Sequence, residues 1–239
     1  MATANRDEAG RVGIHETPVL FDGQRLDQPT FHALYLQTPE HFRAELIEGV
    51  VRVMASPVRY PHGSFDALMA WFLGCYAADT AGTAVGTNVT FKLDPWNELQ
   101  PDVALLIEPD QGGQTLLDAG DFLVGAPEFA IEVAVSSLAH DLKSKRQIYE
   151  AAGAREYLVI DGVHRAVHWF FLREDRFLDL PVGPDGVYRS ITFPGLWLDA
   201  RAYFRGDRRG MLATLRQGLD TPEHAAFVAQ IEQRRLNRP

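Results

Sequence analysis

An acidic residue stands inside a segment that otherwise has the pattern of a buried strand. Residues 129–135 read FAIEVAV, in which six residues are apolar and three are β-branched, as is typical of a strand covered on both faces. Glu132 interrupts this run. A buried carboxylate costs several kcal/mol unless a partner neutralises it or it binds a metal. Alternation places Ala130 and Ala134 beside Glu132, which leaves room for either a ligand or a closely packed helix.

A second carboxylate enters the preceding apolar segment. Residues 101–107 read PDVALLI, which predicts another buried strand that begins at Asp102. If the two strands are neighbours, Asp102 and Glu132 meet at one edge of the sheet. Two adjacent carboxylates repel each other unless one is protonated or a cation lies between them, and Mg²⁺ prefers carboxylate and phosphate oxygens. The alternative for Asp102 is a turn or strand cap.

A lysine follows on the next predicted helix. Of 23 basic residues only Lys92, Lys143 and Lys145 are lysines. Lys145 shares the apolar stripe of its helix with Leu142, Ile148 and Tyr149, and Asp141 lies one turn before it, where it can form an ion pair. Lys145 therefore either extends past the stripe into water or reaches Glu132. The second arrangement places an ammonium where it can orient water and balance charge on phosphorus.

These three residues have the metal–lysine layout of the PD-(D/E)XK nucleases, with the lysine supplied by the following helix because position 134 is alanine. The sequence resembles the Uma-two family of "putative restriction endonucleases", a group within that superfamily. The resemblance extends over about residues 27–200 and rests on several motifs in order: AELIEG (44–49), MASP with His62, QPDVAL (100–105), GAPEFAIEVAVSS (125–137), DLKSK with Tyr149, and AGAREYLVID (152–161).

The resemblance implies roles for five residues. Asp102 and Glu132 are expected to bind the metal, Mg²⁺ or Mn²⁺, and Lys145 is expected to be catalytic. Glu45 and His62 are expected near the site, although Glu45 also fits a charged strand edge and His62 a hydrogen-bonded core histidine. The chain departs from the family pattern at one point, because Val135 stands where many members carry Asp after EVA. That departure puts the activity in question.

The elements that must position these residues follow from periodicity and turn signals. Apolar spacing predicts helices over 62–79 and 138–152, and Gly49 divides 45–54 into a hairpin. Strands are expected over 85–93, 101–107, 129–135, 155–161 and 165–172, with two more between 175 and 193. This order predicts an α/β fold of restriction-endonuclease type, with a mixed central β-sheet flanked by helices. We expect residues 1–25 to form an N-terminal arm, 26–200 the domain, and 201–239 a basic helical tail, with arm and tail outside the core.

Composition restricts the classes of function. The formal net charge is −9, which disfavours non-specific binding to nucleic acid, although the segment 201–239 has eight arginines against four acidic residues. No apolar run approaches the ~18 residues of a membrane span. A single cysteine, Cys75, indicates a reducing, cytoplasmic setting. No P-loop, dinucleotide fingerprint or G-x-S-x-G elbow occurs, and Ser136 and Ser137 are better interpreted as a helix N-cap than as nucleophiles.

The resulting prediction is a Mg²⁺-dependent endonuclease that hydrolyses phosphodiester bonds in nucleic acid, with DNA as the expected substrate. The alternative is an inactive nuclease-fold protein that binds nucleic acid or another protein. Cutting both strands of a duplex requires two sites, so a two-fold homodimer is a candidate assembly. The aromatic residues Trp169, Phe170 and Phe171 then belong either to its interface or to the core.

Overall fold

The computed structural model describes residues 20–54, 60–135 and 137–236. Part of the predicted N-terminal arm (1–19), most of the MASP motif (55–57) and the proposed cap residue Ser136 lie outside these ranges. The described helices are α1 (Gln28–Tyr35), α2 (Tyr60–Ala78), η1 (Pro109–Gln111), α3 (Leu138–His140), η2 (Asp141–Lys145), α4 (Arg146–Ala151), α5 (Ala200–Arg205), α6 (Arg208–Leu219) and α7 (Pro222–Leu236).

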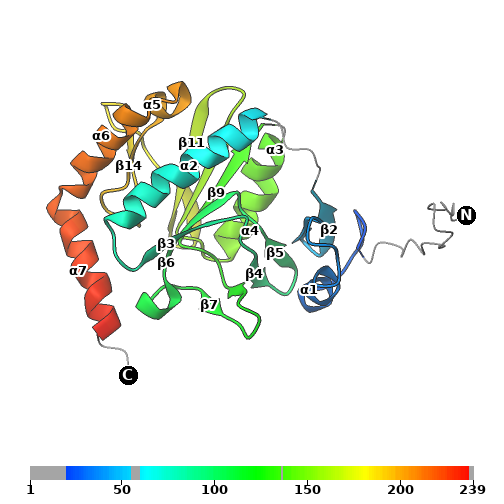
Figure 1. Cartoon of the computed structure of the whole chain (residues 1–239). Coiled ribbons are helices and arrows are strands. Elements are labelled where there is room, and N and C mark those ends of the chain that lie inside the picture. The colour runs from blue at the N-terminus through cyan, green and yellow to red at the C-terminus, as the bar shows by residue number, and fades with distance from the viewer. Residues whose placement is uncertain (1–19, 55–59, 136, 237–239) are drawn as a thin grey trace, which may run out of the picture.

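The larger sheet carries the core of the molecule. Its order is β12 (Arg176–Asp179), β11 (Ala166–Arg173), β10 (Glu156–Asp161), β9 (Phe129–Ala134), β6 (Val103–Ile107) and β3 (Thr83–Thr87). Strands β9 and β10 are parallel and the other pairs are antiparallel. The parallel pair needs a crossover, which η2 and α4 supply. This mixed sheet flanked by helices confirms the predicted fold class (Figure 1).

The register of β6 and β9 decides whether the two carboxylates meet. These strands are antiparallel neighbours, and Val103 pairs with Ile131. The next position along each strand is Asp102 on one and Glu132 on the other. The adjacency on which the sequence argument depended is therefore present.

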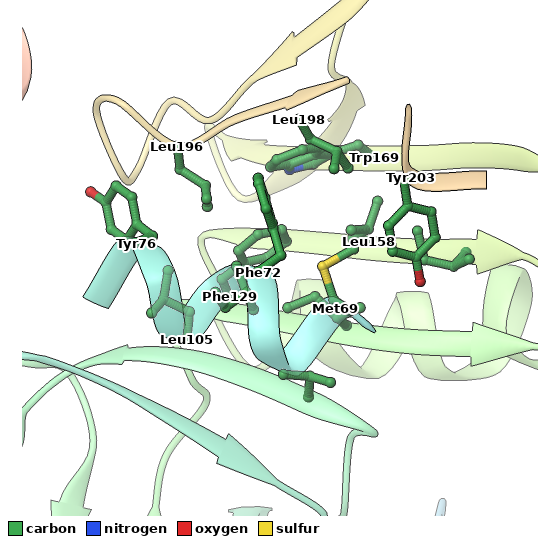
Figure 2. Packing of buried hydrophobic residues seen from close by; sticks show 14 of the residues in the cluster. Met69, Phe72, Tyr76, Leu105, Phe129, Leu158, Trp169, Leu196, Leu198 and Tyr203 are labelled. Atoms are coloured by element: carbon green, nitrogen blue, oxygen red, sulfur yellow. The ribbon is translucent and has the colours of Figure 1, made fainter. Parts of the chain in front are cut away.

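Helix α2 covers one face of this sheet, as Figure 1 shows. Its buried residues Met69, Phe72 and Tyr76 pack against Leu105, Phe129 and Leu158 of the strands (Figure 2). The opposite face of the sheet packs on α4 through a second cluster that includes Ala130, Ala134, Ile148 and Tyr149. The small residues beside Glu132 thus allow this helix to approach the strand closely.

A second six-stranded sheet was not predicted. Its order is β2 (Val50–Val53), β1 (Ala44–Ile47), β5 (Asn97–Leu99), β4 (Phe91–Asp94), β8 (Leu123–Val124) and β7 (Leu116–Leu117). The expected single strand over 85–93 is wrong, because β3 ends at Thr87 and β4 begins in the other sheet. Asn88 lies between them with φ of 52°, a left-handed conformation that Asn tolerates better than most residues.

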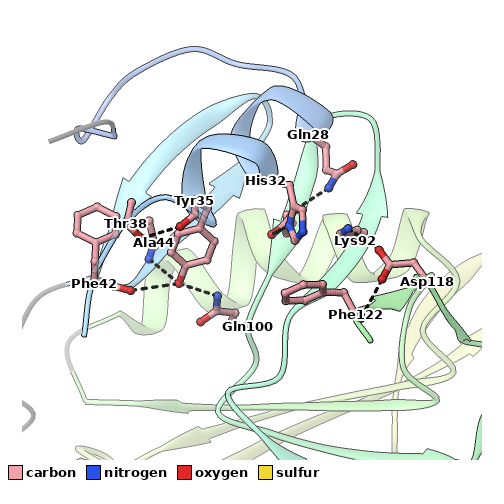
Figure 3. A network of polar contacts seen from close by, with 11 residues as sticks. Gln28, His32, Tyr35, Thr38, Phe42, Ala44, Lys92, Gln100, Asp118 and Phe122 are labelled. Atoms are coloured by element: carbon pink, nitrogen blue, oxygen red, sulfur yellow. Dashed lines mark hydrogen bonds and ion pairs between the residues drawn. The ribbon is translucent and has the colours of Figure 1, made fainter. Parts of the chain in front are cut away.

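The predicted hairpin lies at the edge of this second sheet. Glu48 and Gly49, with φ of 50° and 73°, form the two-residue turn between β1 and β2, which suits the right-handed strand twist. Helix α1 covers the hairpin through Phe31, Leu46 and Val51. Next to it, Gln28 and His32 both contact the buried carboxylate of Glu98, as part of the polar network in Figure 3.

One expectation about the periphery is wrong, and one alternative that the sequence left open is resolved. Met211 and Leu215 of α6 belong to the main hydrophobic cluster, so the C-terminal segment packs on the core instead of lying outside it. Trp169 and Phe170 are buried and belong to the core, which excludes these two from an exposed dimer interface.

A two-stranded sheet of β13 (Val187–Arg189) and β14 (Trp197–Asp199) precedes the tail. No helix within the described residues is long and apolar enough to span a membrane.

Candidate active site

Lys145 lies at the contact between the two sheets. Its Nζ is 2.9 Å from Glu45 Oε2 on β1 and donates to Glu132 Oε1 on β9 at 3.0 Å. The three residues are 5%, 3% and 4% exposed, respectively. A buried ion triad therefore joins the small sheet, the large sheet and the crossover helix. Three of the five predicted site residues are in direct contact here.

Lys145 is the last residue of an irregular helical turn and is buried. The predicted helix over 138–152 is interrupted by the π-helical turn η2, a distortion that is frequent at functional sites. Asp141 and Lys145 do not form the expected ion pair. Instead, Asp141 Oδ2 accepts a hydrogen bond from Ser137 Oγ at 2.6 Å. Ser137 occupies the N-cap position but makes no side-chain cap hydrogen bond.

Glu45 is held from behind by the small sheet. The backbone N–H of Gln100 donates to Glu45 Oε1 at 2.8 Å. The Gln100 side chain in turn donates to the hydroxyl of Tyr35 at 3.0 Å (Figure 3). The Glu45 carboxylate is thus fixed on one side by a backbone donor and on the other by Lys145.

Burial and charge act together on this triad. Burial, with nearby Asp102, Asp141 and Glu45, raises the pKa of Glu132 well above its usual range, although Lys145 opposes the shift. Burial also opposes the charge on Lys145, but Glu132, Glu45 and Asp141 outweigh it and raise the lysine pKa. Lys145 is therefore a permanent cation that faces more acidic groups than it neutralises.

Other buried glutamates differ from Glu132 in their partners. Glu128 accepts hydrogen bonds from the backbone N–H groups of Ile107 and Gln114. Glu156 accepts from Ser190, Trp169 and two backbone N–H groups of residues 191 and 192. Both are fixed by uncharged donors, as structural carboxylates are. Glu132 Oε2, by contrast, accepts no hydrogen bond from any described residue, and Glu132 lines a cleft.

Asp102 lies at the start of β6, where the end of the sheet meets α2. The backbone N–H of Val133 donates to Asp102 Oδ2 at 2.7 Å. The other oxygen, Oδ1, is 3.5 Å from Nε2 of His62, longer than a usual direct hydrogen bond. The Asp102 carboxylate raises the pKa of His62. The remaining two predicted residues are thus brought together as a second group.

Asp66 belongs to this second group and was not predicted. It lies one turn after His62 on α2, and ligand atoms of His62, Asp66 and Asp102 are all within 4.8 Å of one another. Burial, followed by the charge of Asp102, raises the pKa of Asp66 to about 6. Asp66 Oδ1 is buried without a hydrogen-bond partner in the described part of the chain. The i, i+4 spacing of His62 and Asp66 was the available signal.

A single cleft of about 600 Å³ contains both groups. Its lining includes all five predicted residues, namely Glu45, His62, Asp102, Glu132 and Lys145, and also Asp66 and Asp141. The donor set suits a hard divalent cation, because it offers carboxylate oxygens and one imidazole nitrogen. The unpartnered Asp66 Oδ1 is an independent sign that the residues fit such an ion.

Comparison with known proteins identifies the family of the chain. The sequence model of the family described as "Uma2: Putative restriction endonuclease" matches residues 28–201. The chain belongs to the Uma2 family. This confirms the resemblance inferred from the motifs, and the family description supports a nuclease. Both groups of the cleft of this Uma2 protein lie within the matched residues.

One solved structure supports the fold of this Uma2 protein. It is described as a putative nuclease belonging to DUF820 from Anabaena variabilis ATCC 29413, and it aligns with a TM-score of 0.58 and 14% identity. The alignment covers 72% of this chain and 96% of the other. At that identity the match establishes the shared architecture alone. No curated protein matches the sequence.

Proposed function

We propose that this Uma2 protein hydrolyses phosphodiester bonds in nucleic acid, with DNA as its main substrate and a divalent cation, Mg²⁺ or Mn²⁺, as its cofactor. The observation that carries the proposal is the pairing within one cleft of a buried ammonium, Lys145, with the group formed by His62, Asp66 and Asp102. Phosphoryl transfer needs positive charge beside the reacting phosphate, and here the Lys145 ammonium lies next to carboxylates that it does not fully neutralise.

The proposed ligands combine the sequence prediction with the new residue. Asp102, Asp66 and His62 would hold the cation, together with Glu132, which lines the same cleft. When bound, the cation supplies Lewis-acid polarisation of a phosphoryl oxygen. Val133 fixes Asp102 through its backbone N–H, so one oxygen of Asp102 keeps its direction toward the cleft.

The residues of the chain have separate roles in this proposal. Lys145 orients the attacking water and balances negative charge as the phosphate becomes pentacoordinate. Glu45 is a positioning residue, because it holds Lys145 but is itself held by Gln100. The triad excludes bulk water from the base of the cleft, and this strengthens each electrostatic interaction there.

A second candidate function is binding without cleavage. It is favoured by Val135 in place of the Asp expected from the family pattern, and by the net charge of −9. In this alternative, the cleft binds nucleic acid or a protein but catalyses nothing. Three further predictions stay open to test: a homodimer, a cytoplasmic location, and domain limits at residues 26 and 200. Light scattering at micromolar concentration tests the dimer.

A cleavage assay distinguishes the two functions. End-labelled duplex DNA, single-stranded DNA and single-stranded RNA are incubated with the full chain in Mg²⁺, Mn²⁺ or EDTA. We expect shortened products from DNA with either cation and none in EDTA. Cleavage that persists in EDTA would contradict the cation assignment. Retention of labelled nucleic acid without any cleavage would support the non-catalytic alternative.

A further inference from the structure

Two arginines stand on the cleft side of the β1–β2 hairpin. Glu45 pairs across the strands with Arg52, and Ala44 pairs with Val53, which places Arg43 opposite Met54. Alternation along β1 then puts Arg43 on the same face as Glu45. Arg43 and Arg52 both line the cleft. The other face of the hairpin is occupied by its apolar contacts with α1, so these side chains are directed toward the site.

Neither arginine has a counter-ion within the described residues. Both are exposed. Within the part of the chain that the structure describes, the arginines that form ion pairs with acidic side chains are Arg173, Arg176, Arg189 and Arg205. The cross-strand neighbour of Arg52 is Glu45, but Lys145 and the Gln100 backbone already engage that carboxylate. Two guanidinium groups at the mouth of the cleft are thus available to an anion.

The base of the cleft makes such cations necessary for a polyanionic substrate. Glu45, Asp66, Asp102, Glu132 and Asp141 all line it, against one buried lysine. A nucleic acid that approaches the acidic base is repelled until a cation or a basic group compensates. Arginine suits this task because its planar fork binds phosphate oxygens in pairs and stays charged at all relevant pH values.

The spacing of the two arginines fits separate phosphates. They are diagonal neighbours on paired antiparallel strands, a relation that corresponds to about 7–8 Å between backbone positions. Their long side chains spread from that base, so the two head groups need not converge on one phosphate. The lining of the cleft also includes the polar residues Asn88 and His140, which come from other elements than the hairpin.

We propose that Arg43 and Arg52 bind two backbone phosphates that flank the one to be cleaved, and so position the nucleic-acid strand across the cleft. This inference rests on the proposed function and specifies how the same site holds its substrate. Contacts of this kind set orientation and carry no sequence information. The hairpin therefore contributes affinity that is independent of sequence and sensitive to salt.

Salt-dependent binding tests the inference. Fluorescence anisotropy of a fluorescein-labelled DNA duplex is measured in EDTA for the wild type, Arg43→Gln and Arg52→Gln over a range of NaCl concentrations. Each substitution is expected to weaken binding on the order of tenfold for unrelated sequences. Each should also make the slope of log K against log salt shallower by about 0.9. Under cleavage conditions KM should rise while kcat stays within about twofold of the wild type.

Matched variants separate the possible outcomes. Arg235→Gln removes an exposed arginine from α7, on the opposite side of the molecule from the hairpin in Figure 1, and should leave the slope and KM unchanged. Arg52→Lys should recover part of the affinity. If the wild type cleaves DNA but Arg43→Gln and Arg52→Gln keep its salt slope and KM, the inference is wrong and the proposed function stands. If the wild type neither binds nor cleaves any nucleic acid, both are wrong.

Discussion

Replacement of Lys145 with methionine is expected to lower the cleavage rate by about 10²–10³-fold, the usual cost of removing a group that stabilises transition-state charge. The same change should destabilise the fold. Lys145 is the cation between Glu45 and Glu132, and removing one partner from a buried ion pair costs about 3–5 kcal/mol. Proton uptake by one of the two carboxylates offsets part of that cost at low pH. Urea unfolding of both proteins in the absence of metal measures this loss of stability.

The matched control is Lys143→Met. Lys143 lies two residues earlier on the same helical segment but is exposed, so its loss should change neither rate nor stability by much. The double variant Lys145→Met/Glu132→Gln should recover part of the lost stability, because it removes one of the two unpaired carboxylates. If the effects of the two substitutions on unfolding are simply additive, Lys145 and Glu132 are not energetically coupled.

The second large effect is expected at Glu132. Glu132→Gln should abolish detectable cleavage. In the absence of metal, however, urea unfolding should give this variant a free energy of unfolding on the order of 1 kcal/mol higher than that of the wild type. Burial raises the pKa of Glu132, so its ionised form is disfavoured in the folded state. For a group with a raised pKa, the stability it contributes is present at low pH and lost as pH rises through the folded pKa. The advantage of glutamine should therefore grow from acidic to neutral pH.

Glu128→Gln supplies the contrast. Both oxygens of Glu128 accept backbone N–H hydrogen bonds, and an amide cannot accept at both positions, so this variant should lose about 1–3 kcal/mol. If Glu132→Gln is destabilised to the same extent, Glu132 is an ordinary structural carboxylate. Equal Mn²⁺ affinity in the wild type and Glu132→Gln would show that Glu132 is not a ligand.

Much of the candidate site was predictable from local pattern. The charge inside the FAIEVAV run singled out Glu132, and helical spacing placed Lys145 on the buried side of its helix. Both signals are local, because alternation and the 3.6-residue repeat depend only on near neighbours in sequence. The neighbour relation of β6 and β9 was a condition of the predicted site, and the register of the two strands meets it.

Other features had no such signal. The contact of Lys145 with Glu45 spans 100 residues and two sheets, and only tertiary packing brings them together. Asp66, by contrast, had a local signal in its i, i+4 spacing from His62, but the apolar spacing that predicts α2 describes only the core-facing stripe of that helix. The π-helical turn at residues 141–145 has no compositional signature. Asn88, however, was a recognisable turn residue that could have separated β3 from β4.

Calorimetric titration with Mn²⁺ tests the metal centre most directly. Asp102→Asn is the appropriate variant, because an amide oxygen can still accept the Val133 hydrogen bond while the charge toward His62 and Asp66 is lost. We predict one binding site in the wild type, a gain of about 2.7 kcal/mol in unfolding free energy at a hundredfold excess over Kd, and neither effect in Asp102→Asn. Binding of Mn²⁺ by Asp102→Asn with wild-type affinity would contradict the assignment of this cleft as a metal-dependent nuclease site.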